Sequence, residues 1–303
     1  MYPPTDVHIH MIKFSPIIQP LPQLFPGYPR VAVLRLDEID PVISGNKWYK
    51  LVPYIQLARE AGCRRIITAG GAYSNHLVAT ARAARQAGLQ SKAWIRGEKP
   101  QHLSPTLQDA MNDGMELLFM ERVEYATLNL PAGKMANSDD YFIPSGGNGM
   151  PGVLGAAKIL AAADTQPFSH IVGACGTGTM IAGIQYAAAP HQTILGISVL
   201  KNMPEPIPTI QQHLQALSCE RLPEIMHFPY GGYARQQPEV VEFMREAWEK
   251  ERLPLDFVYT GKLFCAIRQL RDKHYFPMEA SILLIHSGGL QGNRSLPTGS
   301  LPF

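Results

Sequence analysis

Residues 65–76 read RIITAGGAYSNH, a short apolar run followed by a glycine turn and the start of a helix. The β-branched first half favours a strand, and the glycine pair breaks it. Ser74 and Asn75 then offer N-cap side chains for a helix that runs to Ala87, where Gly88 stops it. A strand that leads through glycines into a helix is the repeating unit of α/β proteins.

The same unit recurs on both sides of this stretch. Further strands are expected at 31–36, 91–95, 115–120, 171–174, 194–200 and 282–286, and further helices at 48–61, 106–112, 152–163 and from 180 onward. Alternating units of this kind predict parallel sheets covered by helices on both faces. Ligands of such sheets bind beyond the carboxyl ends of the strands, where the glycine loops gather. We expect a domain boundary near residue 148.

Composition narrows the class of protein. The chain has 303 residues, of which 46% are hydrophobic and 17% charged, so it can form a substantial core. The net charge of +2 comes from scattered basic residues, which is unlike a nucleic-acid-binding stripe. The four cysteines show no paired spacing, which argues against a disulfide framework or a metal site. No apolar segment is long enough for a membrane span and no secretory signal is evident, so we expect a cytoplasmic protein.

Two segments are candidates for chemistry. Ser44-Gly45-Asn46-Lys47 places a lysine at a helix start, where the helix dipole repels a cation, so Lys47 can work as a neutral amine. An ordinary surface lysine is the alternative. Gly176-Thr177-Gly178-Thr179 lies between a strand and a helix, where amides and hydroxyls can cradle a phosphate. It matches neither the P-loop nor the dinucleotide motif, and a plain tight turn is the alternative.

Two further glycine-rich segments follow predicted strands. The stretch Ser74-Asn75-His76 offers a hydroxyl, an amide and free helix N–H groups, which suit a carboxylate. A capped helix start is the alternative. The stretch His286-Ser287-Gly288-Gly289 brings a polar group to the end of another strand, with the same alternative. Together the four segments describe one site with an amine, a phosphate cradle, a carboxylate clamp and a polar strand end.

In this order the motifs have a known counterpart. The chain resembles the 1-aminocyclopropane-1-carboxylate deaminase/D-cysteine desulfhydrase family, within the tryptophan-synthase-β-like class (fold type II) of pyridoxal-phosphate enzymes. The resemblance runs from about Val31 to Gly289 and rests on six short motifs: Gly45-Asn46-Lys47, Ser74-Asn75-His76, Ile143-Pro144-Ser145-Gly146-Gly147, Gly176-Thr177-Gly178-Thr179, Val258-Tyr259-Thr260-Gly261-Lys262 and His286-Ser287-Gly288-Gly289.

The resemblance implies an α/β fold of two domains. Each domain has a mostly parallel sheet flanked by helices, and the cofactor, pyridoxal 5′-phosphate, lies in the cleft between them. Residues 1–50 with 149–303 would form the larger, cofactor-binding domain, and residues 51–148 the smaller, substrate-side domain. A homodimer is expected by the same resemblance.

The resemblance also implies a role for each motif. Lys47 would carry the cofactor as an internal aldimine and, once freed, move the proton at Cα of the substrate. The phosphate would bind to Gly176, Thr177, Gly178 and Thr179. Asn75 would contact the 3′-oxygen of the cofactor, and Ser74, Asn75 and His76 would hold the substrate carboxylate. Tyr233 and Tyr259 match the two tyrosines of the family's active site, where they position the substrate.

Two departures from the family bear on the reaction. Trp48 and Tyr49 replace smaller or charged residues beside the lysine, and we expect them to narrow or reshape the mouth of the site. Thr260 and Ser287 stand where the ring-opening deaminases carry a glutamate and a leucine. A hydroxyl near the pyridine nitrogen makes the ring a weaker electron sink than a carboxylate does. This favours β-elimination over ring opening.

We therefore expect a pyridoxal-phosphate-dependent lyase or deaminase of D-cysteine desulfhydrase type. It would convert a small amino acid to a 2-oxo acid and ammonia, with sulfide as well from D-cysteine. A 1-aminocyclopropane-1-carboxylate deaminase or a D-serine-type deaminase remains an alternative. A catalytically silent cofactor-binding protein is an alternative of another class. A nicotinamide dehydrogenase is disfavoured by the absent dinucleotide motif.

Overall fold

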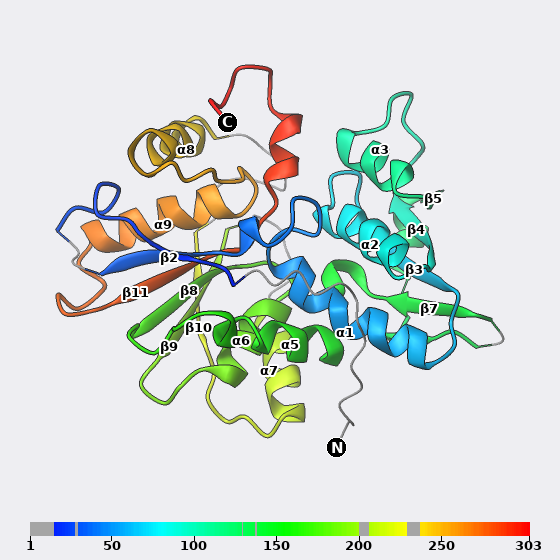
Figure 1. Cartoon of the computed structure of the whole chain (residues 1–303), viewed down its shortest axis with the longest axis horizontal. Helices are drawn as coiled ribbons and strands as arrows, with labels where there is room; N and C mark the ends of the chain where they lie inside the picture. Colours follow the sequence, from blue (N-terminus) through cyan, green and yellow to red (C-terminus); the bar gives the residue numbers. More distant parts are fainter. Residues whose placement is uncertain (1–14, 28–29, 129, 137, 200–205, 229–236) are drawn as a thin grey trace.

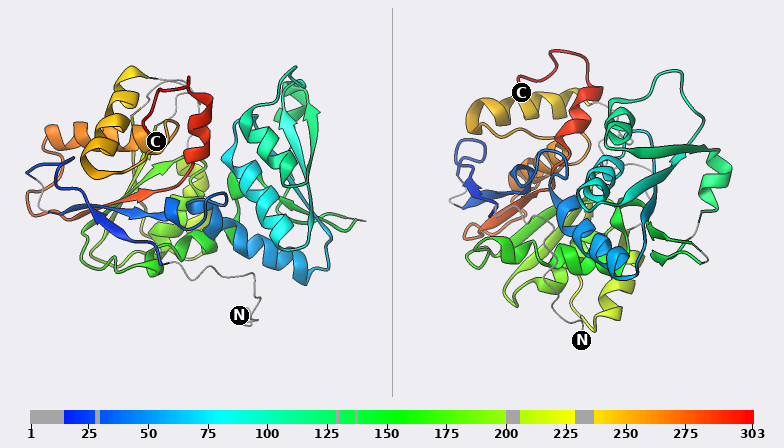
Figure 2. Two further views of the ribbon diagram at one scale, coloured as in Figure 1. Left: turned by 45° about the horizontal axis from the view of Figure 1, so that its top comes forward. Right: turned by 45° about the vertical axis from the view of Figure 1, so that its right-hand side comes forward.

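The computed structural model describes residues 15–27, 30–128, 130–136, 138–199, 206–228 and 237–303. They form two sheets with helices packed around them (Figure 1). Figure 2 shows the two sheets as neighbouring bodies, with α1 (Asn46–Glu60) at their junction. The predicted architecture of two mostly parallel sheets with helices is confirmed.

The larger sheet has the order β1-β2-β11-β8-β9-β10. All its strand pairs are parallel except that of β1 with β2. The strands are β1 (Ile18–Pro20), β2 (Val31–Arg35), β8 (His170–Cys175), β9 (Thr193–Ser198), β10 (Glu224–His227) and β11 (Ile282–His286). Because strands β1 and β11 come from opposite ends of the chain, this sheet assembles only when those ends meet.

The smaller sheet is built from one continuous part of the chain. Its order is β5-β4-β3-β7-β6, and only the pair β6–β7 is antiparallel. The strands are β3 (Arg65–Gly70), β4 (Gln90–Arg96), β5 (Met115–Met120), β6 (Gly133–Lys134) and β7 (Asp140–Ile143). The domain limits at residues 50 and 148 agree with this division but stay a prediction.

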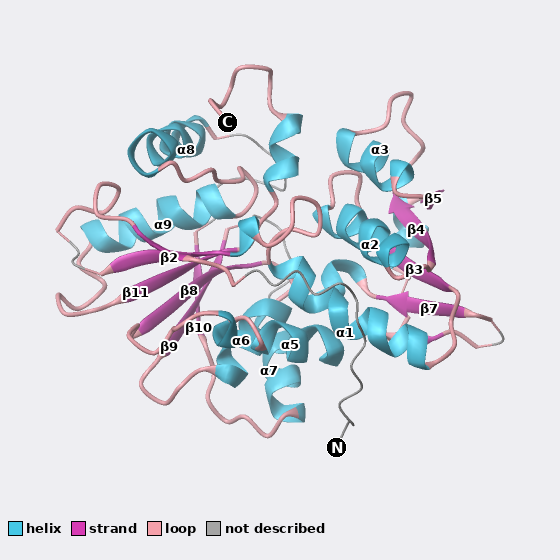
Figure 3. Cartoon of the chain, in the orientation of Figure 1, coloured by secondary structure: helices cyan, strands magenta, loops and turns pink. Residues whose placement is uncertain are grey.

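Helices cover both faces of the larger sheet, as Figure 3 shows by colour. Successive residues of β11 point to opposite faces of the sheet and so belong to two different hydrophobic clusters. Leu284 belongs to the cluster that α8 (Pro238–Glu251) and α9 (Thr260–Asp272) cover. Leu283 and Ile285 join the opposite cluster, with α5 (Met150–Ala157), α6 (Thr179–Ala187) and α7 (Pro206–Ala216). A strand that is buried on both faces has a continuous apolar sequence. This is why the limits of β11 could be predicted correctly.

The smaller sheet is covered differently. Helices α1, α2 (Asn75–Gln86) and α3 (Pro105–Asn112) pack against one face of it. On β4 the residues of that face, such as Ala93 and Ile95, are buried, whereas Lys92 and Trp94 on the other face are half-buried. The two faces of β4 are therefore covered unequally, as expected of a strand with one better-covered face.

Some element limits also differ from the expectation. The helix expected at 152–163 consists of α5 followed by a 3₁₀ turn at Leu160–Ala162. A short helix that was not predicted, α4 (Arg122–Ala126), follows β5. Other short 3₁₀ turns lie at Leu36–Glu38, Ser145–Gly147 and Leu290–Ser295. No helix in the described ranges has the length and hydropathy to span a membrane.

Candidate active site

A cavity of about 510 Å³ lies where the carboxyl ends of the strands of both sheets face each other. Its walls are the start of α1, the ends or following loops of β3, β4 and β7 from the smaller sheet, and those of β8 and β11 from the larger one. This is the position expected for a ligand of parallel sheets. The volume lies within the range of about 300–1,000 Å³ that is usual for small-molecule sites.

Lys47 lies in the first turn of α1 and lines this cavity, so it is no surface lysine. Its Nζ atom donates to Oδ1 of Asn46 at 3.0 Å. Burial lowers the pKa of Lys47 to about 8, and the charge of Asp256 acts in the opposite direction. Such a pKa leaves part of the amine unprotonated near neutral pH, as nucleophilic attack on a carbonyl carbon requires.

The position of Lys47 depends on a close backbone contact between α1 and the loop after β11. The residue before the helix, Gly45, has a φ of +69°, and a Cβ atom there would lie 1.9 Å from the carbonyl oxygen of Ser287. The N–H of Asn46 donates to the same oxygen at 3.2 Å. Only glycine tolerates both the backbone angle and the contact.

A second lysine, Lys50, was not predicted as a site residue. It is 4% exposed, lines the same cavity, and donates from Nζ to the carbonyl oxygen of Gly146 at 2.7 Å. Burial and the nearby charge of Lys47 hold the pKa of Lys50 well below its usual value. Its spacing of three residues from Lys47, which places both on one helix face, is the signal that could have identified it.

The predicted phosphate cradle opens α6. Gly176, Thr177 and Gly178 line the cavity, and Gly178 is left-handed with a φ of +83°. Thr179 is fully buried behind them; its hydroxyl lies 3.0 Å from that of Thr177 and donates to Oδ1 of Asn148. Free amides and hydroxyls at a helix start suit a phosphate, and Lys50 adds a cation to the same cavity.

The predicted carboxylate clamp opens α2 on the opposite side. Ser74, Asn75 and His76 all line the cavity. The ring of His76 is held by Nε2, 2.8 Å from the hydroxyl of Thr68, which itself donates to the carbonyl oxygen of Ile143. Burial and the charges of Lys47 and Lys50 keep the pKa of His76 well below its usual value, so the imidazole is neutral.

A buried carboxylate, Asp256, organises the start of α9. It accepts hydrogen bonds from the N–H groups of Val258, Tyr259 and Thr260 and from the Thr260 hydroxyl. Tyr259 lines the cavity, whereas Thr260 is fully buried and does not. Of the two hydroxyls that were expected near the pyridine nitrogen, Ser287 is the one that lines the cavity. Tyr233 lies outside the described residues.

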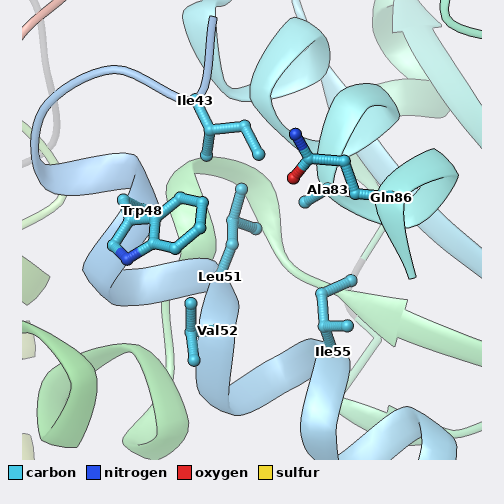
Figure 4. A pocket seen from close by; sticks show the side chains of 7 residues that line it. All are labelled: Ile43, Trp48, Leu51, Val52, Ile55, Ala83 and Gln86. Atoms are coloured by element: carbon cyan, nitrogen blue, oxygen red, sulfur yellow. The ribbon is translucent and has the colours of Figure 1, made fainter. Parts of the chain in front are cut away.

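Trp48 and Tyr49, which were expected to narrow or reshape the mouth of the site, are not among the residues that line this cavity. With 3.6 residues per turn, the face of α1 that carries Lys47 and Lys50 points into the cavity, while Trp48 and Tyr49 point away from it. Trp48 instead lines a small apolar pocket between α1 and α2, with Ile43 and Ala83 among its neighbours (Figure 4). Both aromatic side chains pack against the hydrophobic core.

The residues fit pyridoxal 5′-phosphate. Oδ1 of Asn75 and Nδ1 of His76, in two residues that line the cavity, are buried without a partner in the described residues, and each can accept a hydrogen bond from a ligand. Lys47 would hold the aldehyde carbon, and the Gly176–Thr179 loop with Lys50 the phosphate. In the described ranges no group of three His, Cys, Asp or Glu side chains could hold a metal ion.

The chain is similar to known proteins along most of its length. Residues 12–288 match the family model described as pyridoxal-phosphate dependent enzyme. A putative 1-aminocyclopropane-1-carboxylate deaminase of Pyrococcus horikoshii is 27% identical, covering 94% of this chain and 92% of that protein. A D-cysteine desulfhydrase of Yersinia pestis is 27% identical, covering 86% and 87%.

Solved structures show the same relationship. An ACC deaminase homologue is 27% identical, with a TM-score of 0.78 and coverage of 93% and 92% of the two chains. A threonine deaminase of Solanum lycopersicum, 15% identical with a TM-score of 0.67 over 93% of this chain and 81% of that one, shares the fold. The chain belongs to the family of pyridoxal-phosphate dependent enzymes, and within it is similar to 1-aminocyclopropane-1-carboxylate deaminase homologues and D-cysteine desulfhydrases.

Proposed function

We propose that this enzyme catalyses β-elimination and deamination of a small amino acid, giving a 2-oxo acid and ammonia, and sulfide as well when the substrate is D-cysteine. The observation that carries the proposal is the position of Lys47, a partly neutral amine between a phosphate cradle and a carboxylate clamp in one cavity. The bound cofactor supplies the electron sink that makes the Cα proton acidic.

Different residues of the cavity bind the cofactor and the substrate. The Gly176–Thr179 loop and Lys50 would hold the phosphate, Asn75 would bind the 3′-oxygen of the cofactor, and Ser287 would offer a hydroxyl to its ring. Ser74 and the free amides at the start of α2 bind the substrate carboxylate, because these donors suit an anion. Each of these groups except the buried Thr179 lines the cavity.

Lys47 also moves the proton at Cα. With a pKa of about 8, its amine is basic enough to accept a proton and is free of one in part of the molecules near neutral pH. Tyr259 lines the cavity and positions the substrate, and its hydroxyl can protonate the leaving group. Tyr233 is proposed for the same task from the sequence.

The lining of the cavity supports β-elimination over ring opening. Among the described residues, no aspartate or glutamate lines it, and Ser287 offers a hydroxyl instead. A hydroxyl leaves the pyridine nitrogen less protonated than a carboxylate does, which makes the cofactor ring a weaker electron sink. This weaker sink is sufficient for β-elimination, because a good leaving group departs from Cβ. Deamination of 1-aminocyclopropane-1-carboxylate or of D-serine is the second candidate. A homodimer and a cytoplasmic location stay predictions.

The test has two parts. The purified protein with added cofactor is reduced with borohydride and digested, and mass spectrometry is expected to find the cofactor on Lys47; attachment to Lys50 instead overturns the assignment. Release of pyruvate, 2-oxobutyrate and sulfide is then assayed with D- and L-cysteine, D- and L-serine and 1-aminocyclopropane-1-carboxylate. Sulfide and pyruvate from cysteine support β-elimination, whereas a cofactor bound to Lys47 without turnover of any amino acid contradicts the proposal.

A further inference from the structure

An arginine that no motif includes, Arg96, also lines the cavity. It is the last residue of β4, its side chain is exposed, and its guanidinium has no ion pair or hydrogen bond with another described residue. Two other arginines of the same domain are paired: Arg65 with Asp140 at 2.7 Å and Arg82 with Asp113 at 2.8 Å. Arg96 is thus a cation that faces a ligand site without an internal partner.

The strand register places the backbone of Arg96 at the same sheet edge as the loop that leads to the carboxylate clamp. Strands β3 and β4 are parallel neighbours with Gly70 opposite Ile95, so Arg96 reaches the same edge as the loop that leads to Ser74. The hydroxyl of Ser104 donates to the carbonyl oxygen of Ala72 and ties that loop to the segment after β4. Arg96 therefore ends a strand of the smaller sheet, at the edge from which the loop to Ser74 starts, whereas the phosphate cradle follows β8 of the larger sheet.

Two polar side chains accompany Arg96. Tyr125 and Ser145 line the cavity too, and they come from α4 and from the loop after β7. Burial raises the pKa of Tyr125, while a hydrogen bond with the Ser145 side chain and the charge of Arg96 act against that shift. Tyr125 thus remains a neutral hydroxyl at physiological pH, and it leaves the charge of Arg96 uncompensated.

The other cations of the cavity have partners. Lys47 is assigned to the aldehyde of the cofactor, and Lys50 donates to Gly146 beside the phosphate cradle. The α-carboxylate of the substrate already has Ser74 and the helix amides. No carboxylate of the described residues lines the cavity, so an anion that pairs with Arg96 has to come with a ligand, and the cofactor phosphate already has the glycine-threonine cradle and Lys50.

We propose that Arg96 selects amino acids whose β-substituent, the group that leaves, carries a second anionic group, for which a carboxylate is the best geometric match. A planar guanidinium binds a carboxylate through two parallel hydrogen bonds, and Tyr125 adds a neutral donor beside it. This inference rests on the proposed function and deepens it, because it adds the charge of the substrate side chain.

The experiment measures binding to the holoenzyme with isosteric ligand pairs. Aspartate is compared with asparagine and glutamate with glutamine, each as both enantiomers, through the change in the visible spectrum of the bound cofactor. The variants are Arg96→Gln, Arg96→Lys, which keeps the charge, and Arg122→Gln. Arg122 is an exposed arginine on neighbouring α4 that does not line the cavity, so it is the matched control.

We expect the wild type to bind the acid of one pair about tenfold more tightly than its amide. Arg96→Gln removes this preference without changing the affinity for the amide, Arg96→Lys retains part of it, and Arg122→Gln leaves it intact. The preference also decreases as salt is added, because the pair is exposed.

Three results overturn the inference. If Arg96→Gln lowers the affinity for the acid and for the amide equally, Arg96 binds the α-carboxylate, which both ligands share. An absent preference in the wild type, with neutral amino acids still bound and converted, refutes the role of Arg96 and leaves the proposed function standing. If the cofactor is attached to Lys47 but its spectrum changes with no acidic and no neutral amino acid, both the role of Arg96 and the proposed function are refuted.

Discussion

The two walls of the cavity are built in different ways. The wall from the larger sheet, here the cofactor wall, consists of residues 45–47, 176–178 and 287–289 and is shaped by backbone in close contact. The wall from the smaller sheet, the substrate wall, consists of Ser74–His76, Arg96, Tyr125 and Ser145 and is shaped by side chains, of which Arg96 and Ser145 are exposed.

The difference explains why the cofactor is easier to identify than the substrate. Backbone in contact tolerates few residue types, so the cofactor wall leaves glycine motifs in the sequence. An exposed side chain can be exchanged without loss of the fold, so the substrate wall can change its ligand through single substitutions. The following predictions test this contrast, from the largest expected effect to the smallest.

Gly45→Ala is expected to cost about 4 kcal/mol of unfolding free energy, because it adds a left-handed backbone penalty to a clash with backbone. The new Cβ atom would lie 1.9 Å from the carbonyl oxygen of Ser287. Urea unfolding of the apoprotein measures the loss. Gly62→Ala is the matched control, since Gly62 has nearly the same φ, +67°, but open space around its Cβ position. Equal losses in both variants would show that the contact with Ser287 contributes nothing.

Lys47→Met is expected to stabilise the apoprotein by up to about 3 kcal/mol at pH 7, because burial of this amine penalises its charged form. The folded-state pKa is about 8 against 10.5 for the free side chain. The unfolded chain therefore binds more protons between these values, so the penalty is complete below pH 8 and disappears as the pH rises past 10.5. Thermal unfolding across this pH range measures the gain. Lys99→Met, at an exposed position, should show none.

Attachment of the cofactor to the apoprotein should accelerate about tenfold per pH unit below pH 8 and level off above it, because only the neutral amine attacks a carbonyl carbon. The inflection follows the pKa of about 8 for Lys47. Stopped-flow absorbance gives the rate. Non-covalent binding to Lys47→Ala over the same pH range serves as the control, and a flat rate profile would contradict the lowered pKa.

Tyr125→Phe is expected to have the smallest effect, a few-fold rise in KM for an acidic substrate, which is typical of one lost hydrogen bond. Cofactor affinity should not change, because Tyr125 belongs to the substrate wall. Equilibrium titration with the cofactor and steady-state kinetics separate the two quantities. A clear loss of cofactor affinity would mean that the two walls are not independent.

Much of the fold could be predicted locally. The strands at 115–120 and 282–286 have the predicted limits, because apolar β-branched runs between glycines are local signals. The short strand β7 and the edge strand β10 were not predicted. Neither forms a long apolar run, and each exists because a parallel neighbour, β3 or β9, supplies its hydrogen bonds.

The site was predicted less evenly. Lys47, the clamp at Ser74 and the cradle at Gly176 all line the cavity. Arg96 and Asp256 were not identified, because a charged residue after a strand or before a helix has no distinctive local pattern. Trp48 was assigned to the mouth of the site because it follows Lys47 in the sequence. Adjacent residues of a helix point in different directions, however, and the side chain of Trp48 packs against the core.

The sequence by itself determined the α/β class, since this depends on local patterns of glycine turns and helix starts, and the order of its motifs pointed to the cofactor and to Lys47. Only the tertiary structure decided which charged side chains share the cavity. Arg96 and Lys50 are far apart in the chain and meet because parallel strands of two sheets end at one place. The charge that the substrate meets is therefore a property of strand order and register, which no single segment encodes.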